Sequence, residues 1–300
     1  MSSQTHERVF ITGASGFVGR NILDQLADRP VVALERSDNP ELDQRSNTTV
    51  VAGDVTDAGS LQGTMDGCST VVHLVAIIEE SGGATFDQVI RQGTENVLAE
   101  AKRAGIQRFI FMSALGAQDN PKYAYMQAKW RAEQAVKESR MHYTIFRPSV
   151  IFGPGDGFIN ALAGVVKNFP IIPVVGDGTS RFQPVHVSEV ARSFAKAVND
   201  PDATSGSTYE LGGGKVYTYE EMLDVIAKAL GKSKRKVHVP VALMKPVLVM
   251  SQPLPKALRP PVTQEQLKML ALDNTTDVSA THDLIGATPI RLEDGIGYIH

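Results

Sequence analysis

The 300-residue sequence contains a single cysteine, Cys68, and no marked excess of either charge. One thiol excludes an intramolecular disulfide framework and a zinc site built from cysteines, and it favours a reducing compartment. Thirty basic and 33 acidic residues give a net charge of −3, so no basic surplus is available to hold a phosphate backbone. Nucleic acid is therefore not an expected partner.

Long apolar runs are missing as well. No stretch reaches the ~18 apolar residues that a membrane-spanning helix needs. The best candidate, residues 241–250, is interrupted by Lys245 and Pro246. Residues 1–8 are polar and carry no apolar signal region, so we expect a cytoplasmic protein without an integral membrane segment. The 42% of hydrophobic residues still suffice for a full core, which argues against disorder.

Apolar runs and helical patterns alternate through the first half of the chain. Strands are expected at 9–12, 31–34, 50–52, 71–75, 109–112 and 143–146, with helices at about 16–27, 86–104 and 122–139. Strands that are apolar almost throughout and are joined by helices indicate a parallel sheet covered on both faces. The sequence therefore predicts an α/β fold of Rossmann type, with a doubly wound parallel sheet.

A glycine-rich segment, residues 13–19, follows the first strand and opens the first helix. Gly13 permits a tight turn, Gly16 lets the backbone approach a pyrophosphate, and Gly19 lets helix and strand pack closely. The helix N-terminus adds free N–H groups and a positive dipole end. No Lys-Ser or Lys-Thr follows, which excludes a P-loop. The pattern favours dinucleotide binding over the alternative, a tight turn without a ligand.

Two charged residues, Glu35 and Arg36, end the second strand about 20 residues further on. An acidic residue at this place commonly holds the ribose 2′-hydroxyl of NAD(H), whereas an arginine accommodates the 2′-phosphate of NADP(H). Arg36 favours NADP(H), NAD(H) remains the alternative, and a surface ion pair would need no cofactor. Asp54, after the third strand, could accept the adenine amino group or cap a following helix. We predict that the cofactor contacts Gly13, Ser15, Gly16, Phe17, Val18, Gly19, Glu35, Arg36, Asp54, Val55, Leu74, Val75, Ala76 and Lys129.

Tyr125 and Lys129 lie four residues apart in a helical pattern, which places them on one helix face. A nearby ammonium lowers the pKa of a phenol, so this pair could exchange a proton with a carbonyl while nicotinamide exchanges a hydride. The spacing alone can arise by chance. Its position after the fifth strand strengthens it, because the carboxyl end of that strand faces the same crevice as the glycine loop. Tyr125 and Lys129 are the predicted catalytic residues.

After Pro148 the pattern changes to glycine- and proline-rich loops with helices near 159–167, 187–198 and 219–230. We therefore expect an NAD(P)-binding Rossmann domain over 1–150 and a mixed C-terminal region over 151–300. Of that region, residues about 185–215 are expected to return to the Rossmann domain, and the rest to form a smaller substrate-binding or lid subdomain. The basic run 232–236 is expected to be a solvated turn. The apolar stretch 241–254 is expected to pack as core, to roof an apolar pocket, or to meet a membrane or partner subunit.

Together these features resemble the short-chain dehydrogenase/reductase superfamily, in its extended and atypical branches. The resemblance rests on the three glycines, Asp54-Val55, the Tyr125–Lys129 pair, and Arg147-Pro148 before residues 153–156. The chain is more closely similar to the group that includes the NAD(P)H-binding accessory subunit of mitochondrial complex I. That likeness rests on residues 92–97, 183–187, 262–270 and 273–274. The resemblance implies a dinucleotide cofactor and a small-molecule substrate.

Two positions depart from the superfamily pattern. Ala114 stands where a Ser or Thr hydroxyl usually holds the substrate carbonyl, and Ser113 is one residue off, on the opposite side of an extended chain. Ile90 stands where members usually have an Asn. By analogy with other lost donors, the missing hydroxyl lowers the rate by roughly 10²–10³-fold. Cofactor binding is not affected by either departure.

Three functions fit these residues. The first is an NAD(P)(H)-dependent oxidoreductase that reduces or oxidises a small apolar carbonyl or alcohol through Tyr125. The second is a non-catalytic NADPH-binding accessory or assembly protein, peripherally associated with a respiratory or quinone-related membrane complex. A sugar-nucleotide epimerase or dehydratase is the third and weakest candidate. The loops from 153 to 181 lack a cluster of basic residues, which counts against a diphosphate substrate. His73 is expected to line the cofactor crevice, His186 to be structural, and no metal site is expected.

Overall fold

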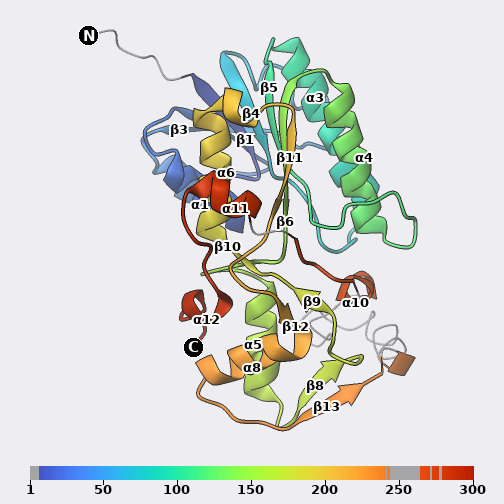
Figure 1. Ribbon diagram of the computed structural model, residues 1–300. Coiled ribbons are helices and arrows are strands. Elements are labelled where there is room, and N and C mark those ends of the chain that lie inside the picture. The colour runs from blue at the N-terminus through green and yellow to red at the C-terminus, as the bar shows by residue number, and fades with distance from the viewer. Residues whose placement is uncertain (1–6, 241, 244–263, 271, 277–278) are drawn as a thin grey trace. The chain divides into compact units, whose positions relative to one another are not determined.

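The structure is a computed structural model that describes residues 7–240, 242–243, 264–270, 272–276 and 279–300 (Figure 1). Its residues form two compact units. The first consists of the chain up to Pro148 together with Ser188–Glu210, and the second of Ser149–Val187 together with the described part of Leu211–His300. We had expected the boundary at residue 150 and the return to the first unit at about 185–215.

A seven-stranded sheet forms the centre of the first unit, in the order β11-β6-β5-β4-β1-β2-β3. The chain winds outward in opposite directions from β1 and β4, which places a switch point between these two neighbouring strands. The pairs of β1 with β2 and β4, of β2 with β3, and of β5 with β4 and β6 are parallel. This arrangement confirms the predicted Rossmann-type α/β fold. The strands are β1 (Arg8–Thr12), β2 (Val31–Glu35), β3 (Thr48–Ala52), β4 (Cys68–His73), β5 (Arg108–Met112), β6 (His142–Pro148) and β11 (Ser207–Leu211).

Helices cover both faces of this sheet (Figure 1). Apolar residues of α3 and α4, such as Val97 and Ala132, form one buried cluster with strand residues that include Phe10 and Phe109. On the other face, Phe194 of α6 packs against Phe146 of β6, with ring centroids 4.7 Å apart. The helices are α1 (Phe17–Gln25), α2 (Pro40–Asp43), η1 (Asp87–Gln92), α3 (Gly93–Arg103), α4 (Ala124–Glu138), α6 (Val187–Asn199) and α7 (Pro201–Thr204).

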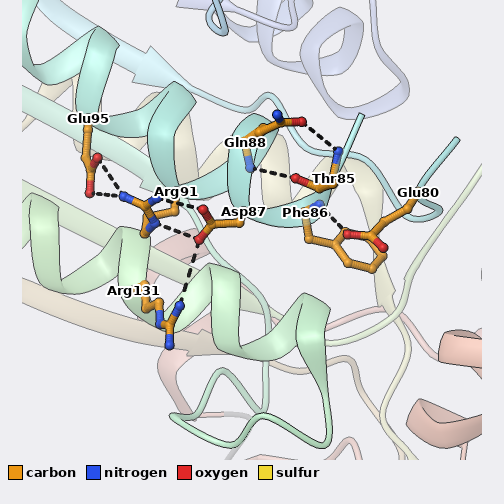
Figure 2. A network of polar contacts seen from close by, with 8 residues as sticks. All are labelled: Glu80, Thr85, Phe86, Asp87, Gln88, Arg91, Glu95 and Arg131. Carbon is orange, nitrogen blue, oxygen red and sulfur yellow. Dashed lines mark hydrogen bonds and ion pairs between the residues drawn. The ribbon is translucent and has the colours of Figure 1, made fainter. Parts of the chain in front are cut away.

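The helix expected over residues 86–104 is divided into a π-helical segment, η1, and the α-helix α3. The N-terminus of η1 is capped reciprocally: the Thr85 backbone N–H donates to Gln88 Oε1, and the Gln88 N–H donates to Thr85 Oγ1 (Figure 2). Just before η1, the Phe86 N–H donates to the Glu80 carboxylate over 2.9 Å. These contacts fix the direction in which Phe86 enters the helix.

Ion pairs bind η1 to its neighbours. Arg91 donates to Asp87 on the preceding turn and to Glu95 on the following turn, with nitrogen–oxygen distances of 2.6 and 2.9 Å. Arg131 of α4 lies 3.9 Å from Asp87, so the same carboxylate faces α4 (Figure 2). The π turn is therefore held on both sides by charged side chains that are partly exposed.

The second unit has its own core. Apolar residues of α5, α8 and α12, among them Ile159, Ile226 and Leu292, gather with Phe152 and Tyr217. Thr218 and Glu221 form a capping box that begins α8. The elements are β7 (Ile151–Phe152), α5 (Phe158–Asn168), β8 (Ile172–Val175), β9 (Arg181–Phe182), β10 (Val185–His186), β12 (Tyr217–Thr218), α8 (Tyr219–Ala229), β13 (Lys236–Val239), α10 (Gln264–Leu270), α11 (Ser279–Ile285) and α12 (Leu292–Gly295).

The basic run 232–236 is exposed at Lys232, Ser233 and Arg235, as predicted, but two of its lysines have structural partners. The Lys234 ammonium donates to the carbonyls of Val166, Lys167 and Phe169, at distances of 2.6–3.1 Å, and so caps the C-terminus of α5. Lys236 already belongs to β13 and pairs with Glu220 and Asp224. A cation at a helix C-terminus satisfies free carbonyls and interacts favourably with the helix dipole, which gives Lys234 a structural role, whereas Lys236 is held by its ion pairs.

Most of the apolar stretch 241–254 lies outside the described residues, and so does the 262–263 part of the subgroup motif. Leu243 is described and is 65% exposed. Within the described part of the chain, no helix is both long enough and apolar enough to cross a membrane.

Candidate functional site

The glycine loop lies at the carboxyl end of β1 and has the shape that a pyrophosphate requires. Gly13 has a φ of +75°, in the left-handed region, and a Cβ on Gly19 would lie only 2.2 Å from the Gly13 carbonyl oxygen. Gly16 is the N-cap of α1, with no side-chain cap and no acidic residue in the first turn. The Ser15 N–H is taken by the Glu35 carboxylate, but no side chain caps the first turn of α1 itself, so the residues present fit the pyrophosphate of a dinucleotide there.

Glu35 and Arg36 take different roles at the end of β2. The Glu35 carboxylate accepts hydrogen bonds from the Ser15 backbone N–H (3.1 Å) and from Ser15 Oγ (2.8 Å). The acidic residue is thus attached to the glycine loop itself. Arg36 follows immediately and is exposed. The structure brings together three predicted cofactor residues here, and the exposed guanidinium is available to an anionic ligand.

Asp54 and Val55 follow β3. Asp54 accepts from the backbone N–H and the hydroxyl of Thr56, both at 2.8 Å, in a local turn. The helix that it was expected to cap is absent, because the described residues 55–66 form consecutive turns. Val55 is 4% exposed, and its Cγ2 would lie 3.0 Å from a Cβ on Gly93. The Val55 side chain therefore packs against the start of α3.

The segment after β4 lies beside the glycine loop. A Cβ on Gly13 would lie 3.4 Å from Leu74 Cβ and 3.5 Å from Val75 Cγ2. The Leu74 N–H donates to the Thr12 carbonyl at the end of β1. Val75 and Ala76 are half-buried. These predicted cofactor residues thus flank the turn in which Gly13 sits.

His73 does not line a crevice, contrary to the prediction. The side chain is completely buried, with Nδ1 2.6 Å from Thr12 Oγ1 and Nε2 3.1 Å from Thr94 Oγ1. Burial lowers the pKa of His73 to about 3, with a smaller contribution from the charge of Lys129. The Thr94 hydroxyl donates to the Ile90 carbonyl, so it accepts from Nε2–H, and Nδ1 accepts from Thr12. This neutral imidazole connects β1, β4 and the start of α3.

Burial also lowers the pKa of His186, which packs edge-on against Phe152 in the second unit. The ring centroids of these two side chains lie 5.1 Å apart. The contact gives His186 a packing role in that unit.

Tyr125 and Lys129 lie on one face of α4, near the carboxyl ends of β4 and β5. The Tyr125 ring packs edge-on against Phe86, with centroids 5.7 Å apart. Lys129 is 1% exposed, and its ammonium donates to the Met112 carbonyl over 2.7 Å. Burial raises the pKa of Tyr125 to about 12 and lowers that of Lys129 to about 7. The sequence had predicted a lowered phenol pKa; in this structure burial of the phenol raises it instead.

The departures at Ala114 and Ile90 have clear structural settings. Ala114 follows β5 and is half-buried, whereas Ser113 is 3% exposed and donates to Glu133 Oε1 at 2.5 Å. The Ser113 hydroxyl therefore points into the interface between β5 and α4. Ile90 is fully buried in the core, within η1. Neither position supplies a hydroxyl or amide for a substrate.

Sequence reasoning missed Glu133 and its partner in this region. Glu133 is completely buried and accepts from Arg147 Nε (2.8 Å) and Nη2 (2.7 Å). A signal was present, because Tyr125, Lys129 and Glu133 are spaced by four residues and share a helix face. A charged residue on a buried face needs a partner, and Arg147 ends the next strand. Among the described residues, no group of acidic, His and Cys side chains could hold a metal ion.

Comparison with known proteins now identifies the family. Residues 13–163 match the model of an NAD(P)H-binding family, which covers half of the chain and the whole glycine loop. This chain belongs to that NAD(P)H-binding family, which agrees with the predicted resemblance to short-chain dehydrogenases/reductases. Nicotinamide dinucleotide binding and an oxidoreductase-like character follow from that membership.

Relatives of this NAD(P)H-binding protein include both a subunit and an enzyme. The chain is 30% identical to subunit 9 of the NADH dehydrogenase 1 alpha subcomplex from Arabidopsis thaliana, over 78% of this chain and 61% of the relative. It thus spans less than two thirds of that protein. It is 29% identical to a ceramide reductase from Caulobacter vibrioides, over 80% of this chain and 76% of that one.

Solved structures show the same fold. A nucleoside-diphosphate-sugar epimerase from Staphylococcus aureus matches with a TM-score of 0.76 at 21% identity, over 97% of this chain and 99% of that chain. At this level of identity the match concerns the fold alone.

Proposed function

We propose that this protein is an NADP(H)-binding oxidoreductase that acts on a small apolar carbonyl or alcohol, with Tyr125 as proton donor. The observation that carries the proposal is the N-terminus of α1. Its first turn has free N–H groups, a glycine N-cap and no acidic side chain. A diphosphate is the ligand that such a turn binds best, because the backbone supplies several donors and the helix dipole adds positive potential.

The preference for NADP(H) is supported by Arg36 and by the position of Glu35. The Glu35 carboxylate is engaged with both donors of Ser15, whereas the guanidinium of Arg36 is exposed beside it. A guanidinium can donate two parallel hydrogen bonds to a 2′-phosphate. Charge-assisted bonds of this kind contribute roughly 1.5–3 kcal/mol, which corresponds to about 10- to 100-fold in affinity.

Cofactor choice is tested by titrating NADPH and NADH against wild type and Arg36→Ala, with Trp130 fluorescence as the signal. Arg36→Ala should lose at least about tenfold in NADPH affinity and leave NADH affinity unchanged. Arg45→Ala is the matched control, since it removes one positive charge from an arginine that is paired with Asp24. Equal NADH and NADPH affinities in wild type would show that Glu35, not Arg36, selects the cofactor.

The chemistry assigned to the chain's own residues is proton transfer and positioning. When bound, the nicotinamide supplies or accepts the hydride. Tyr125, whose pKa is raised to about 12, stays protonated at neutral pH and is suited to donate a proton to a carbonyl oxygen. Lys129 would hold the nicotinamide ribose hydroxyls, which requires its ammonium to leave the Met112 carbonyl or to share its hydrogens with it. The named substrate of the ceramide reductase relative is a lipid, which agrees with an apolar substrate.

The second candidate function is a non-catalytic NADPH-binding accessory protein of a respiratory or quinone-related complex. The observation that favours it is the absence of a hydroxyl at Ala114, together with the engagement of Ser113 by Glu133. The respiratory subunit from Arabidopsis thaliana is consistent with this reading.

One assay separates the two functions. NADPH oxidation is measured with a panel of aldehydes, ketones and quinones for wild type and Tyr125→Phe. The enzyme proposal expects turnover that Tyr125→Phe abolishes, with NADPH affinity nearly unchanged, because the phenol acts on substrate. Equal background rates in both proteins, with cofactor binding intact in both, would leave the accessory function.

A further inference from the structure

A carboxylate is buried in the middle of α4, on the same face as Tyr125 and Lys129. Glu133 is completely buried, and such a charge is costly unless it is paired and hydrogen-bonded. Both oxygens are in fact engaged. Oε1 accepts from Ser113 Oγ (2.5 Å) and from Arg147 Nε (2.8 Å), and Oε2 accepts from Arg147 Nη2 (2.7 Å).

These contacts fix the register of α4 against the sheet. Lys129 donates to the carbonyl of Met112, and one turn later Glu133 accepts from the next residue, Ser113. Two successive turns of the helix thus hold two successive residues at the end of β5. Arg147 adds a third point, because it belongs to β6 and also lies 3.6 Å from Glu210 at the end of β11. Glu133 is the one residue of these contacts that reaches both β5 and β6.

We infer that Glu133 is a positioning residue, whose carboxylate holds α4 to the ends of β5 and β6 and keeps the Lys129 ammonium in place for the cofactor. The inference rests on the proposed NADP(H) binding and adds a residue to it. Glu133 acts through Lys129 and contacts neither substrate nor cofactor itself.

The charge of Glu133 is part of this role. Burial lowers the pKa of Lys129 to about 7, and the negative charge of Glu133 opposes that shift. From β5, Lys129 faces the Met112 carbonyl and the Phe111 ring, whose centroid lies 5.2 Å from Nζ. From β4 it faces His73, which is stacked on Phe111 and neutral. Tyr125, on its own helix, stays protonated at neutral pH. Glu133 therefore raises the fraction of Lys129 that is protonated near neutral pH.

The test measures NADP⁺ affinity between pH 6 and pH 8 by Trp130 fluorescence, in Glu133→Gln and in the matched control Glu138→Gln. Glu138 lies on the same helix and is exposed, so its variant removes the same charge without touching the buried cluster. Removing the Glu133 charge should lower the pKa of Lys129 by about one unit. Relative to the control, Glu133→Gln should then bind NADP⁺ about tenfold more weakly at pH 8 and within about twofold at pH 6.

The outcomes are distinct. A loss that is equal at every pH, or no loss relative to Glu138→Gln, overturns the inference. Wild type that binds no NADP⁺ at any pH overturns the proposed function itself, and the inference with it. If circular dichroism shows that Glu133→Gln does not fold, Glu133→Asp replaces it, because it keeps the charge and shortens the reach. Glu133→Asp should bind several-fold more weakly at every pH, with the pH profile of wild type; affinity identical to wild type would refute the positioning role.

Discussion

The glycine loop and the polar face of α4 lie in the same unit but are built in opposite ways. At the loop, the start of α1 has a glycine cap and no acidic residue in its first turn, and Glu35 is attached to Ser15 just before it. Lys129 and Glu133 of α4, together with Ser113 after β5, are instead buried, and they donate to or accept from other groups of the protein. Dinucleotide recognition is thus available from the backbone alone. Chemistry at α4 requires Lys129 to exchange an internal hydrogen bond for one to a ligand, which costs on the order of 1 kcal/mol.

The largest effect is expected at Gly19 of the glycine loop, where the neighbouring backbone leaves no room for a side chain. Gly19→Ala places a Cβ 2.2 Å from the Gly13 carbonyl and 2.6 Å from that of Ala14. We expect a loss of about 3 kcal/mol in unfolding free energy and no measurable NADPH binding. Urea unfolding and fluorescence titration measure both. In the control Gly164→Ala, on α5, no atom lies within 4 Å of the new Cβ, and stability should rise by about 1 kcal/mol. Cofactor affinity preserved in Gly19→Ala would contradict the assigned shape of the loop.

The second effect concerns the buried side chain of His73, which makes the unfolding free energy depend on pH. His73 is neutral in the folded state down to about pH 3, whereas the unfolded chain takes up a proton near pH 6.5. The unfolded state therefore binds more protons between these values, and stability falls as the pH falls from 6.5 toward 3. His73→Gln keeps a donor and an acceptor but does not titrate. Between pH 6.5 and 4.5 it should lose roughly 2 kcal/mol less unfolding free energy than wild type.

The control for this pH experiment is His142→Gln, which replaces an exposed histidine of the same unit. Its unfolding free energy should depend on pH as that of wild type does. An identical pH dependence in His73→Gln and wild type would show that His73 is accessible to protons in the folded protein.

The smallest effect concerns Ala114, which follows β5 next to the buried Ser113. Ala114→Ser restores a hydroxyl where the family usually has one, without disturbing Ser113. If the proposed enzyme activity is limited by this donor, NADPH oxidation with small ketones or aldehydes should rise by about tenfold or more, with NADPH affinity unchanged. Ser113→Ala is the comparison. The Ser113 hydroxyl is bound to Glu133, so its removal should not lower the rate through a lost substrate contact. A rate that does not respond to Ala114→Ser would mean that the missing hydroxyl is not what limits turnover.

What the sequence predicted well was local. The three glycines, the strand ends at Glu35 and at Met112, and the helix over Tyr125 and Lys129 follow from short-range patterns of apolar and glycine residues. The helix expected to end at residue 104 does so, and Gly105, just after the C-cap Ala104, has a φ of +74°. Such features depend on residues within one or two turns, so the sequence contains the information directly.

What the sequence did not predict depends on contacts between distant residues. The pKa of Tyr125 follows from burial against Phe86, 39 positions earlier, and not from its neighbour Lys129. Lys234 belongs to a run that was predicted to be solvated, but its ammonium donates to three carbonyls at the end of α5. These carbonyls lie 65 to 68 residues earlier in the sequence. His73 seemed to face a crevice because its strand ends there, yet hydroxyls from two other elements enclose it. Burial of a polar group is set by tertiary structure, which periodicity does not encode.

The π turn of η1 has a consequence for how this protein tolerates insertions and deletions. Compared with an α-helix, a π turn accommodates one additional residue, and each residue of an α-helix rotates the chain by about 100°. Deleting one residue from Asp87–Gln92 would therefore convert the π turn into an ordinary α-helical turn and leave the rotation of the chain before it nearly unchanged. Phe86 would keep its place against the Tyr125 ring, and the sheet and α3 would stay as they are. A frame-preserving deletion of one codon in this segment is therefore expected to be tolerated without a change in the surroundings of the phenol.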